Sequence, residues 1–151
     1  MTDHAEMYSR VQWRLAQDAL NAANVDGEFV TFVAFEYTNS GDTTNRVPGY
    51  GHKCVIFRDA SVVDDPIASD ASGATEYAPS ANELWSMLAG YQCLTIPHHS
   101  AKGVSSHETN STINMSTDWD QVNAAFQPAV EIFSIHPIES SSAASWPNCS
   151  L

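Results

Sequence analysis

The sequence predicts one α/β domain with largely parallel strands. Three segments have the apolar spacing or the capping residues of helices, and four short runs have the β-branched, apolar composition of buried strands. Helical and strand-like segments alternate along the chain, which is typical of α/β layering. The chain has 151 residues, the length of a single domain, and its 43% apolar content suits a globular core.

The first part of the chain predicts one helix and two strands. The helix has apolar residues at helical spacing, at Val11, Leu15, Ala19 and Ala23. It is expected to end before the turn residues Asp26 and Gly27. Residues 29–35 are β-branched and aromatic, which predicts a buried strand. After a polar, glycine-rich loop, the run "KCVIF" from Lys53 to Phe57 predicts a second strand.

The second part predicts two further helices and two further strands. Ser80 and Glu83 have the spacing of a capping box, so a helix is expected from there to Gly90. Residues 92–96 predict the third strand, a short helix is expected between Asp118 and Pro128, and residues 129–135 predict the fourth strand. Residues 1–137 are thus expected to form the domain, and the serine-rich residues 138–151 a loose tail.

Charge and composition argue against several classes of function. Eighteen acidic residues against six basic ones give a formal net charge of -12, which disfavours nucleic acid and anionic membrane surfaces as partners. No apolar run approaches the roughly 20 residues that span a membrane, and no signal-peptide pattern is present. Neither a Gly-x-Ser-x-Gly elbow nor a glycine-rich nucleotide loop occurs. A soluble, acidic protein is expected, and its compartment is left open.

The cysteines predict a reduced core rather than a disulfide scaffold. Cys54, Cys93 and Cys149 are odd in number and lack the Cys-x-x-Cys spacing of metal sites. Cys54 and Cys93 lie inside apolar runs, where cysteine behaves as a small buried apolar residue.

Candidate metal ligands lie beside the predicted strands. Glu36 directly follows the first predicted strand, His98 and His99 come after the third, and His136 follows the fourth. In parallel α/β folds such positions share one face of the sheet. His52 precedes its strand instead, so an antiparallel pairing with the first strand would return it to Glu36. Imidazole nitrogen and carboxylate oxygen are common ligands of zinc, manganese and iron, so the sequence predicts a divalent metal site at this end of the strands.

Adjacent histidines raise a question of orientation. Neighbouring residues on an extended backbone point to opposite sides, so at most one of His98 and His99 is expected to contact an ion. A histidine at a strand end also commonly makes an ordinary hydrogen bond, and this alternative stays open. It is favoured most for His107, in the polar run "SSHETNS".

Five segments resemble the PHP (polymerase and histidinol phosphatase) superfamily. They are "TDH", "AFEYT", "GHKCVIFRD", "LTIPHHSAKG" and "VEIFSIH", in this order. The resemblance implies part of a distorted (β/α)7 barrel with mostly parallel strands and divalent metal ions at its carboxyl rim. It implies four metal ligands, namely His4, Glu36, His52 and His98. It also implies Asp3 as a support for His4, and His99 and His136 as catalytic residues, either of which would orient the phosphate or donate a proton.

The same resemblance shapes the expected function. The superfamily's opening His-x-His strand and closing Asp-x-His have no counterpart here, so the chain is expected to be an incomplete middle portion of a barrel. Such a portion would associate with the missing parts or form an oligomer. Its parent is expected to hydrolyse a small phosphate ester with metal-activated water. Lys102 or Arg58 would contact the substrate anion, with surface solvation as the favoured alternative for both. The alternatives are a non-catalytic metal-binding or structural remnant, and an unrelated α/β binding module.

Overall fold

The computed structural model describes residues 2–42, 49–70, 76–99, 113–114 and 117–131. Its helical elements are η1, a 3-10 helix at Ala5–Met7, α1 at Arg10–Ala23 and α2 at Ala81–Met87. Its longer strands are β1 (Ala34–Tyr37), β3 (Lys53–Phe57) and β6 (Cys93–Pro97). Four two-residue strands complete it: β2 (Gly41–Asp42), β4 (Ile67–Ala68), β5 (Glu76–Tyr77) and β7 (Ile113–Asn114).

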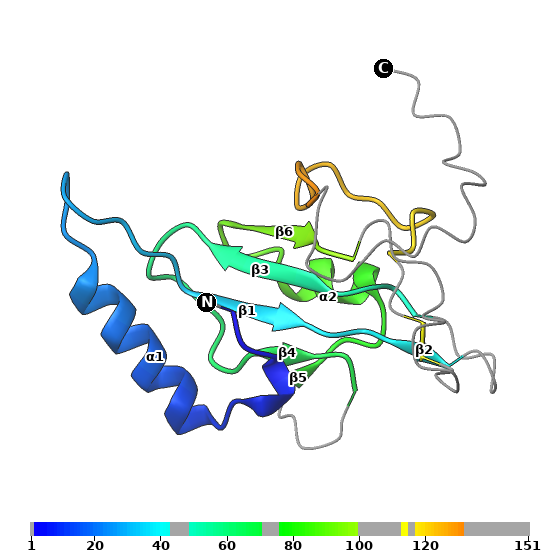
Figure 1. Ribbon diagram of the computed structural model, residues 1–151, viewed down its shortest axis with the longest axis horizontal. Helices are drawn as coiled ribbons and strands as arrows, with labels where there is room; N and C mark the ends of the chain where they lie inside the picture. Colours follow the sequence, from blue (N-terminus) through cyan, green and yellow to red (C-terminus); the bar gives the residue numbers. More distant parts are fainter. Residues whose placement is uncertain (1, 43–48, 71–75, 100–112, 115–116, 132–151) are drawn as a thin grey trace.

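An antiparallel sheet of three strands organises the described residues. β3 lies in the middle, with β1 on one side and β6 on the other, and both neighbours run antiparallel to it (Figure 1). The register places Glu36 opposite Cys54, and Cys54 opposite Ile96. Two small sheets accompany it, an antiparallel pair of β2 with β7 and a parallel pair of β4 with β5.

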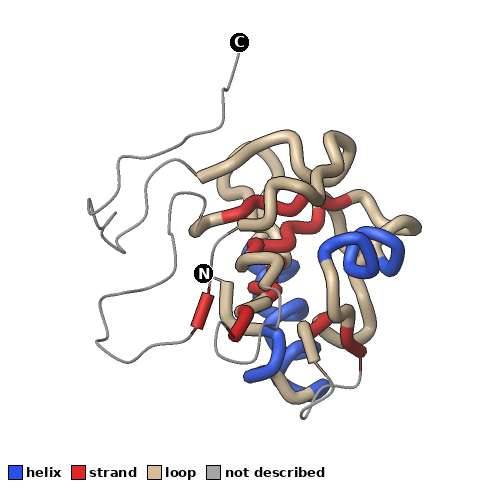
Figure 2. The backbone as a smooth tube through the Cα atoms, turned by 90° about the vertical axis from the view of Figure 1, so that its right-hand side faces the viewer, coloured by secondary structure: helices blue, strands red, loops and turns tan. Residues whose placement is uncertain are grey.

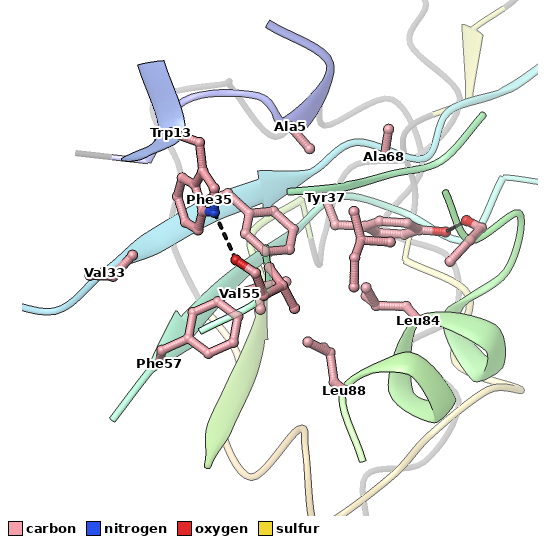
Figure 3. Packing of buried hydrophobic residues seen from close by; sticks show 13 residues of the cluster. Ala5, Trp13, Val33, Phe35, Tyr37, Val55, Phe57, Ala68, Leu84 and Leu88 are labelled. Atoms are coloured by element: carbon pink, nitrogen blue, oxygen red, sulfur yellow. Dashed lines mark hydrogen bonds between the residues drawn. The ribbon is translucent and has the colours of Figure 1, made fainter. Parts of the chain in front are cut away.

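The core lies on one face of this sheet. Phe35, Tyr37, Val55 and Phe57 project there from β1 and β3, and all are fully buried. Figure 3 shows Leu84 and Leu88 beside them, and Trp13 of α1 against Phe35 at a ring distance of 5.9 Å. Burial of each such side chain contributes about 1.5–3 kcal/mol, so this apolar face is the main source of stability.

The first predicted helix is confirmed, but the side that it buries differs from the expected one. Ser9 and Gln12 form a complete capping box at the start of α1. Val11 and Leu15 are 68% and 62% exposed, whereas Trp13 is fully buried. The Trp13 indole N–H donates to the Val63 carbonyl at 2.9 Å, so the ring is held by a polar contact as well as by packing. One large side chain thus decides which face of the helix packs.

The predicted helix after Ser80 and two of the strands are also confirmed. The Ser80 hydroxyl accepts a hydrogen bond from the Glu83 amide and so caps α2. β3 has the predicted bounds, and β6 begins and ends one residue later than predicted. β1 begins at Ala34 rather than at residue 29, and Phe29 and Phe32 before it are more than half exposed.

Two later elements were predicted wrongly within the described residues. Residues 118–127 contain turns and no helix, and residues 129–131 form no strand. The segment instead follows the open edge of β6, where the Thr95 amide donates to the Phe126 carbonyl and the Glu131 amide to the Pro97 carbonyl. Residues 132–135 of the predicted strand and the tail at 138–151 lie outside the described residues.

The expected parallel barrel is wrong. The described strands form no closed barrel, and loops surround a short sheet in Figure 2. A parallel pair needs a crossover that carries the chain back along the sheet. The connection from β1 to β3 contains no described helix, and the chain reverses direction there. No helix among the described residues is long and apolar enough to cross a membrane.

Lys53 is an unusual member of the core face. Its side chain is fully buried on the central strand, and its ammonium group donates to the Tyr50 carbonyl at 2.6 Å. Burial lowers the pKa of Lys53 from 10.5 to about 8, with a smaller opposing effect from the charge of Asp118. The folded protein therefore releases this proton more readily than the unfolded chain does.

This burial predicts a pH-dependent stability. Between pH 8 and 10.5 the unfolded chain binds the Lys53 proton and the folded protein has lost it, so this residue makes stability rise with pH. The contribution over that range is about 3 kcal/mol. Chemical denaturation with a chelator present should show Lys53→Met to be more stable than wild type at pH 7.5, with a smaller difference at pH 10. A constant difference would contradict the prediction.

Candidate metal centre

The sheet register brings polar side chains together on the face opposite the core. Glu36 and Cys54 are cross-strand partners on β1 and β3. Side chains alternate along a strand, so His52 lies on the same side as Cys54, two positions earlier. His98 follows the end of β6, and its amide contacts the His52 carbonyl at 3.4 Å. One end of the sheet therefore carries Glu36, His52 and His98 together.

A glycine and an asparagine set the approach of the chain to His52. Gly51 has φ 80°, a left-handed conformation that glycine adopts without steric cost. Its amide donates to the Asn39 carbonyl at 3.1 Å, and the Tyr50 amide donates to the Asn39 side chain at 2.9 Å. These bonds hold the start of β3 against the end of β1, which places His52 beside Glu36.

The Glu36 carboxylate is the centre of the cluster. Its Oε1 lies 3.0 Å from His52 Nδ1, 3.2 Å from His98 Nε2 and 3.4 Å from His4 Nδ1. The Thr38 hydroxyl also contacts it, at 3.4 Å, and contacts His4 as well. His4 is brought in by the backbone, because the Glu36 amide donates to the Asp3 carbonyl at 2.9 Å. Three imidazoles from separate segments thus surround one carboxylate.

The electrostatics follow from this geometry. Burial alone would raise the pKa of Glu36, but hydrogen bonds from His52 and His98 and the charges of His98 and His4 outweigh it and hold that pKa well below its ordinary value. Burial alone would lower the pKa of His98, but its contacts with Cys54 and Glu36 raise it to about 9. The cluster therefore carries a half-buried carboxylate balanced by at least one imidazolium at neutral pH.

Three histidines fit a divalent metal ion. His52, His98 and His99 each offer a ring nitrogen, and these atoms all lie within 4.8 Å of one another. An ion would draw them closer, because a zinc–nitrogen bond is about 2 Å long. The rings of His98 and His99 are 4.6 Å apart, and those of His52 and His99 are 4.9 Å apart. A buried group of imidazoles beside a carboxylate suits zinc, manganese or iron.

The expected opposite orientation of His98 and His99 is wrong. β6 ends at Pro97, so the alternation of a strand does not extend over the two histidines. Both rings face the His52 side of the cluster, and His99 is 6% exposed.

The other predicted site residues have different positions. The Asp3 carboxylate accepts a hydrogen bond from the Tyr8 hydroxyl at 3.5 Å, and the part of Asp3 that supports the cluster is its backbone carbonyl. Arg58 follows the far end of β3 and donates to Gln92, away from the histidines. His136, His107 and Lys102 lie outside the described residues. The use of His4, Glu36, His52 and His98 as metal ligands stays a prediction.

Sequence reasoning missed three side chains that complete the surroundings. Thr38 contacts His4, Ser40 contacts His52 Nε2 at 2.8 Å, and Cys54 contacts His98 Nδ1 at 3.5 Å. Alternation along "KCVIF" carries the signal for Cys54, because it places that residue on the His52 face. Thr38 and Ser40 follow Glu36 at two and four positions, which is also same-face spacing.

The fold and the cluster define a small α/β protein with a candidate metal centre. Residues 1–146 match the model of a family described as "Protein of unknown function (DUF3604)". The chain therefore belongs to the DUF3604 family. No curated protein and no solved structure matches it. The resemblance to the PHP superfamily is wrong, because the matched family is DUF3604 and the described sheet is antiparallel and open.

The cluster predicts an unusually basic histidine. In metal-free protein the ring protons of His98 should titrate near pH 9, because the cation is stabilised by the neighbouring groups. Glu36→Gln removes the negative charge and should shift the pKa of His98 downward by about one unit or more. Histidine NMR titration of both proteins measures this directly, and Glu28→Gln is the matched control at an exposed acid. An unchanged His98 titration in Glu36→Gln would contradict the assigned contact.

Proposed function

We propose that this protein binds a divalent metal ion at its histidine cluster and uses it to hydrolyse a small phosphate ester. The observation that carries the proposal is the convergence of the ring nitrogens of His52, His98 and His99 within 4.8 Å, beside the half-buried Glu36 carboxylate. Histidine clusters of this kind are uncommon in a core unless an ion or a hydrogen-bond network stabilises them.

The kinds of donor atom in the cluster limit which metal ions it would bind. The three imidazoles are neutral nitrogen donors when deprotonated, and Glu36 adds a carboxylate oxygen within 3.2 Å of the His98 ring. This set is compatible with zinc, manganese or iron and offers no thiolate in its centre. The carboxylate also offsets part of the ion's charge, which favours retention of the ion in a buried site.

A bound divalent ion would supply a water of lowered pKa as the nucleophile. The chain's own residues would then orient the groups around the ion and exchange protons. Besides offering an oxygen to the ion, the Glu36 carboxylate contacts His52 and His98 and would hold these imidazoles in orientation. Among Glu36's three imidazole neighbours His4 is the most exposed, with 41% of its side chain accessible, so it is the one best placed to exchange a proton with solvent.

The size and charge of the substrate follow from the whole molecule. A net charge of -12 disfavours a long polyanion such as nucleic acid. A small phosphate ester needs only local attraction, which an ion at the cluster provides. For this reason the proposal is limited to small phosphorylated compounds.

A second function is favoured by one specific observation. The side chains of Glu36, His52 and His98 are 12%, 5% and 13% exposed, and both nitrogens of His52 are already in contact with side-chain oxygens. Such closure is typical of a structural ion that stabilises a fold and leaves no position for substrate. A non-catalytic metal-binding role is therefore the alternative.

Metal content tests the site itself. Purified wild-type protein, dialysed without chelator, should contain close to one equivalent of a transition metal by elemental analysis. His52→Ala and His98→Ala should each lose most of it, because each removes one of three clustered donors. Glu28→Gln, an exposed acid, should retain it and so excludes non-specific binding to an acidic surface. Equal metal in all four proteins would remove the proposed centre.

Hydrolysis distinguishes the two functions. Metal-loaded wild type should release phosphate from a generic aryl phosphate monoester, and His98→Ala should lower kcat by about 100-fold or more through loss of the ion. Addition of excess zinc to His98→Ala should leave most of the loss in place. A wild type that holds metal and shows no turnover of monoesters or diesters would favour the structural role.

A further inference from the structure

Cys54 occupies a position that the proposed function does not use. It lies on the central strand β3, directly opposite Glu36 on β1 and Ile96 on β6. His98 lies two residues after Ile96, just beyond the end of β6, and its ring contacts the Cys54 sulfur directly. The thiol is half-buried and forms no disulfide.

The sulfur contacts the side of the His98 ring that faces away from Glu36. Sγ is 3.5 Å from His98 Nδ1, while His98 Nε2 is 3.2 Å from Glu36 Oε1. The Thr2 hydroxyl lies 3.6 Å from the same sulfur. A continuous chain of polar contacts thus runs from Thr2 through Cys54 and His98 to Glu36, with one ring nitrogen used on each side.

A metal-binding imidazole has two nitrogens with different tasks. One nitrogen binds the ion. The other carries a hydrogen and donates a hydrogen bond to an acceptor, which fixes the orientation of the ring. In most such sites that acceptor is a carboxylate, a backbone carbonyl or water. At His98 the atom in that place is a cysteine sulfur, a weaker and larger acceptor.

We propose that Cys54 is a positioning residue of the metal centre: its sulfur accepts a hydrogen bond from the Nδ1–H of His98 and thereby directs Nε2 toward the ion. This inference rests on the proposed metal site but not on hydrolysis. If it is correct, the metal affinity of the site depends on a thiol that is not itself one of the candidate metal ligands.

Cys93 provides the internal comparison. It lies on β6 opposite Phe57, on the core face of the sheet, and burial raises its pKa to about 11. It is also a free cysteine, so the two thiols differ in face and contacts rather than in redox state. Any effect of removing a small buried thiol from the sheet in general should therefore appear at both positions, whereas positioning of His98 should appear at Cys54 alone.

Zinc affinity is the first measurement. Competition with a chromophoric chelator at pH 7.5 should show that Cys54→Ala binds zinc about 10–100-fold more weakly than wild type, the usual loss for an orienting partner of a metal-binding histidine. Cys54→Ser should lie between them because its hydroxyl also accepts a hydrogen bond, and Cys93→Ala should match wild type. Affinities of Cys54→Ala within twofold of wild type, or an equal loss in Cys93→Ala, would overturn the proposal.

Ring-proton exchange is the second measurement, and it needs no metal. In metal-free protein the proposed bond places a proton on His98 Nδ1, 3.5 Å from the Cys54 sulfur. This proton should be protected from water in wild type and exchange at least about tenfold faster in Cys54→Ala, by nitrogen-15 histidine NMR. Cys93→Ala should leave the exchange unchanged, and an unprotected Nδ1 proton in wild type would overturn the proposal.

The two measurements separate the possible failures. Wild type that binds no zinc but protects the Nδ1 proton would contradict the metal site and leave the Cys54 contact supported as an orienting bond. Wild type that binds zinc with an unprotected Nδ1 proton would contradict the role of Cys54 alone. If Cys54→Ala fails to fold, Cys54→Ser and the wild-type exchange rate decide.

Discussion

The register of the three-stranded sheet is the constraint on which the rest of the molecule depends. Because β3 pairs with β1 and β6 in one alignment, Glu36, Cys54 and Ile96 form a row across the sheet. A slip of one residue would turn every side chain of a strand to the other face. Such a slip in β1 would turn Glu36 into the apolar core and turn the rings of Phe35 and Tyr37 out of it. The packing of the core and the geometry of the cluster therefore select the same register.

The two faces of the sheet solve different physical problems. The core face excludes water with Phe35, Tyr37, Val55 and Phe57, and it tolerates one buried ammonium group, that of Lys53. The opposite face collects groups that need polar partners, and Glu36 has three imidazoles near a single oxygen atom. A buried carboxylate without such partners would be costly. The imidazoles supply those partners, and a metal ion at the cluster would interact with the same carboxylate and ring nitrogens.

Sequence reasoning predicted local structure better than the arrangement of elements in space. The bounds of β3 and the cap of α2 depend on neighbouring residues, and both were predicted. The proximity of Glu36 and His52 followed once antiparallel pairing was assumed, but the strand runs alone are equally compatible with a parallel sheet, which was the wrong choice. The inward turn of His99 and the burial of Trp13 in place of Val11 depend on contacts with distant segments. No periodicity in the sequence carries that information.

The cluster draws its members from four segments that are far apart in the chain, at residues 4, 36, 52 and 98–99. None of these segments contains enough donors to hold an ion tightly by itself, so an unfolded chain competes poorly for metal. Any ion that binds the native cluster must therefore shift the folding equilibrium by mass action. It would also join β1, β3 and β6 into one cooperative unit, whose local opening requires release of the ion. Cellular metal supply would then set the lifetime of the native protein.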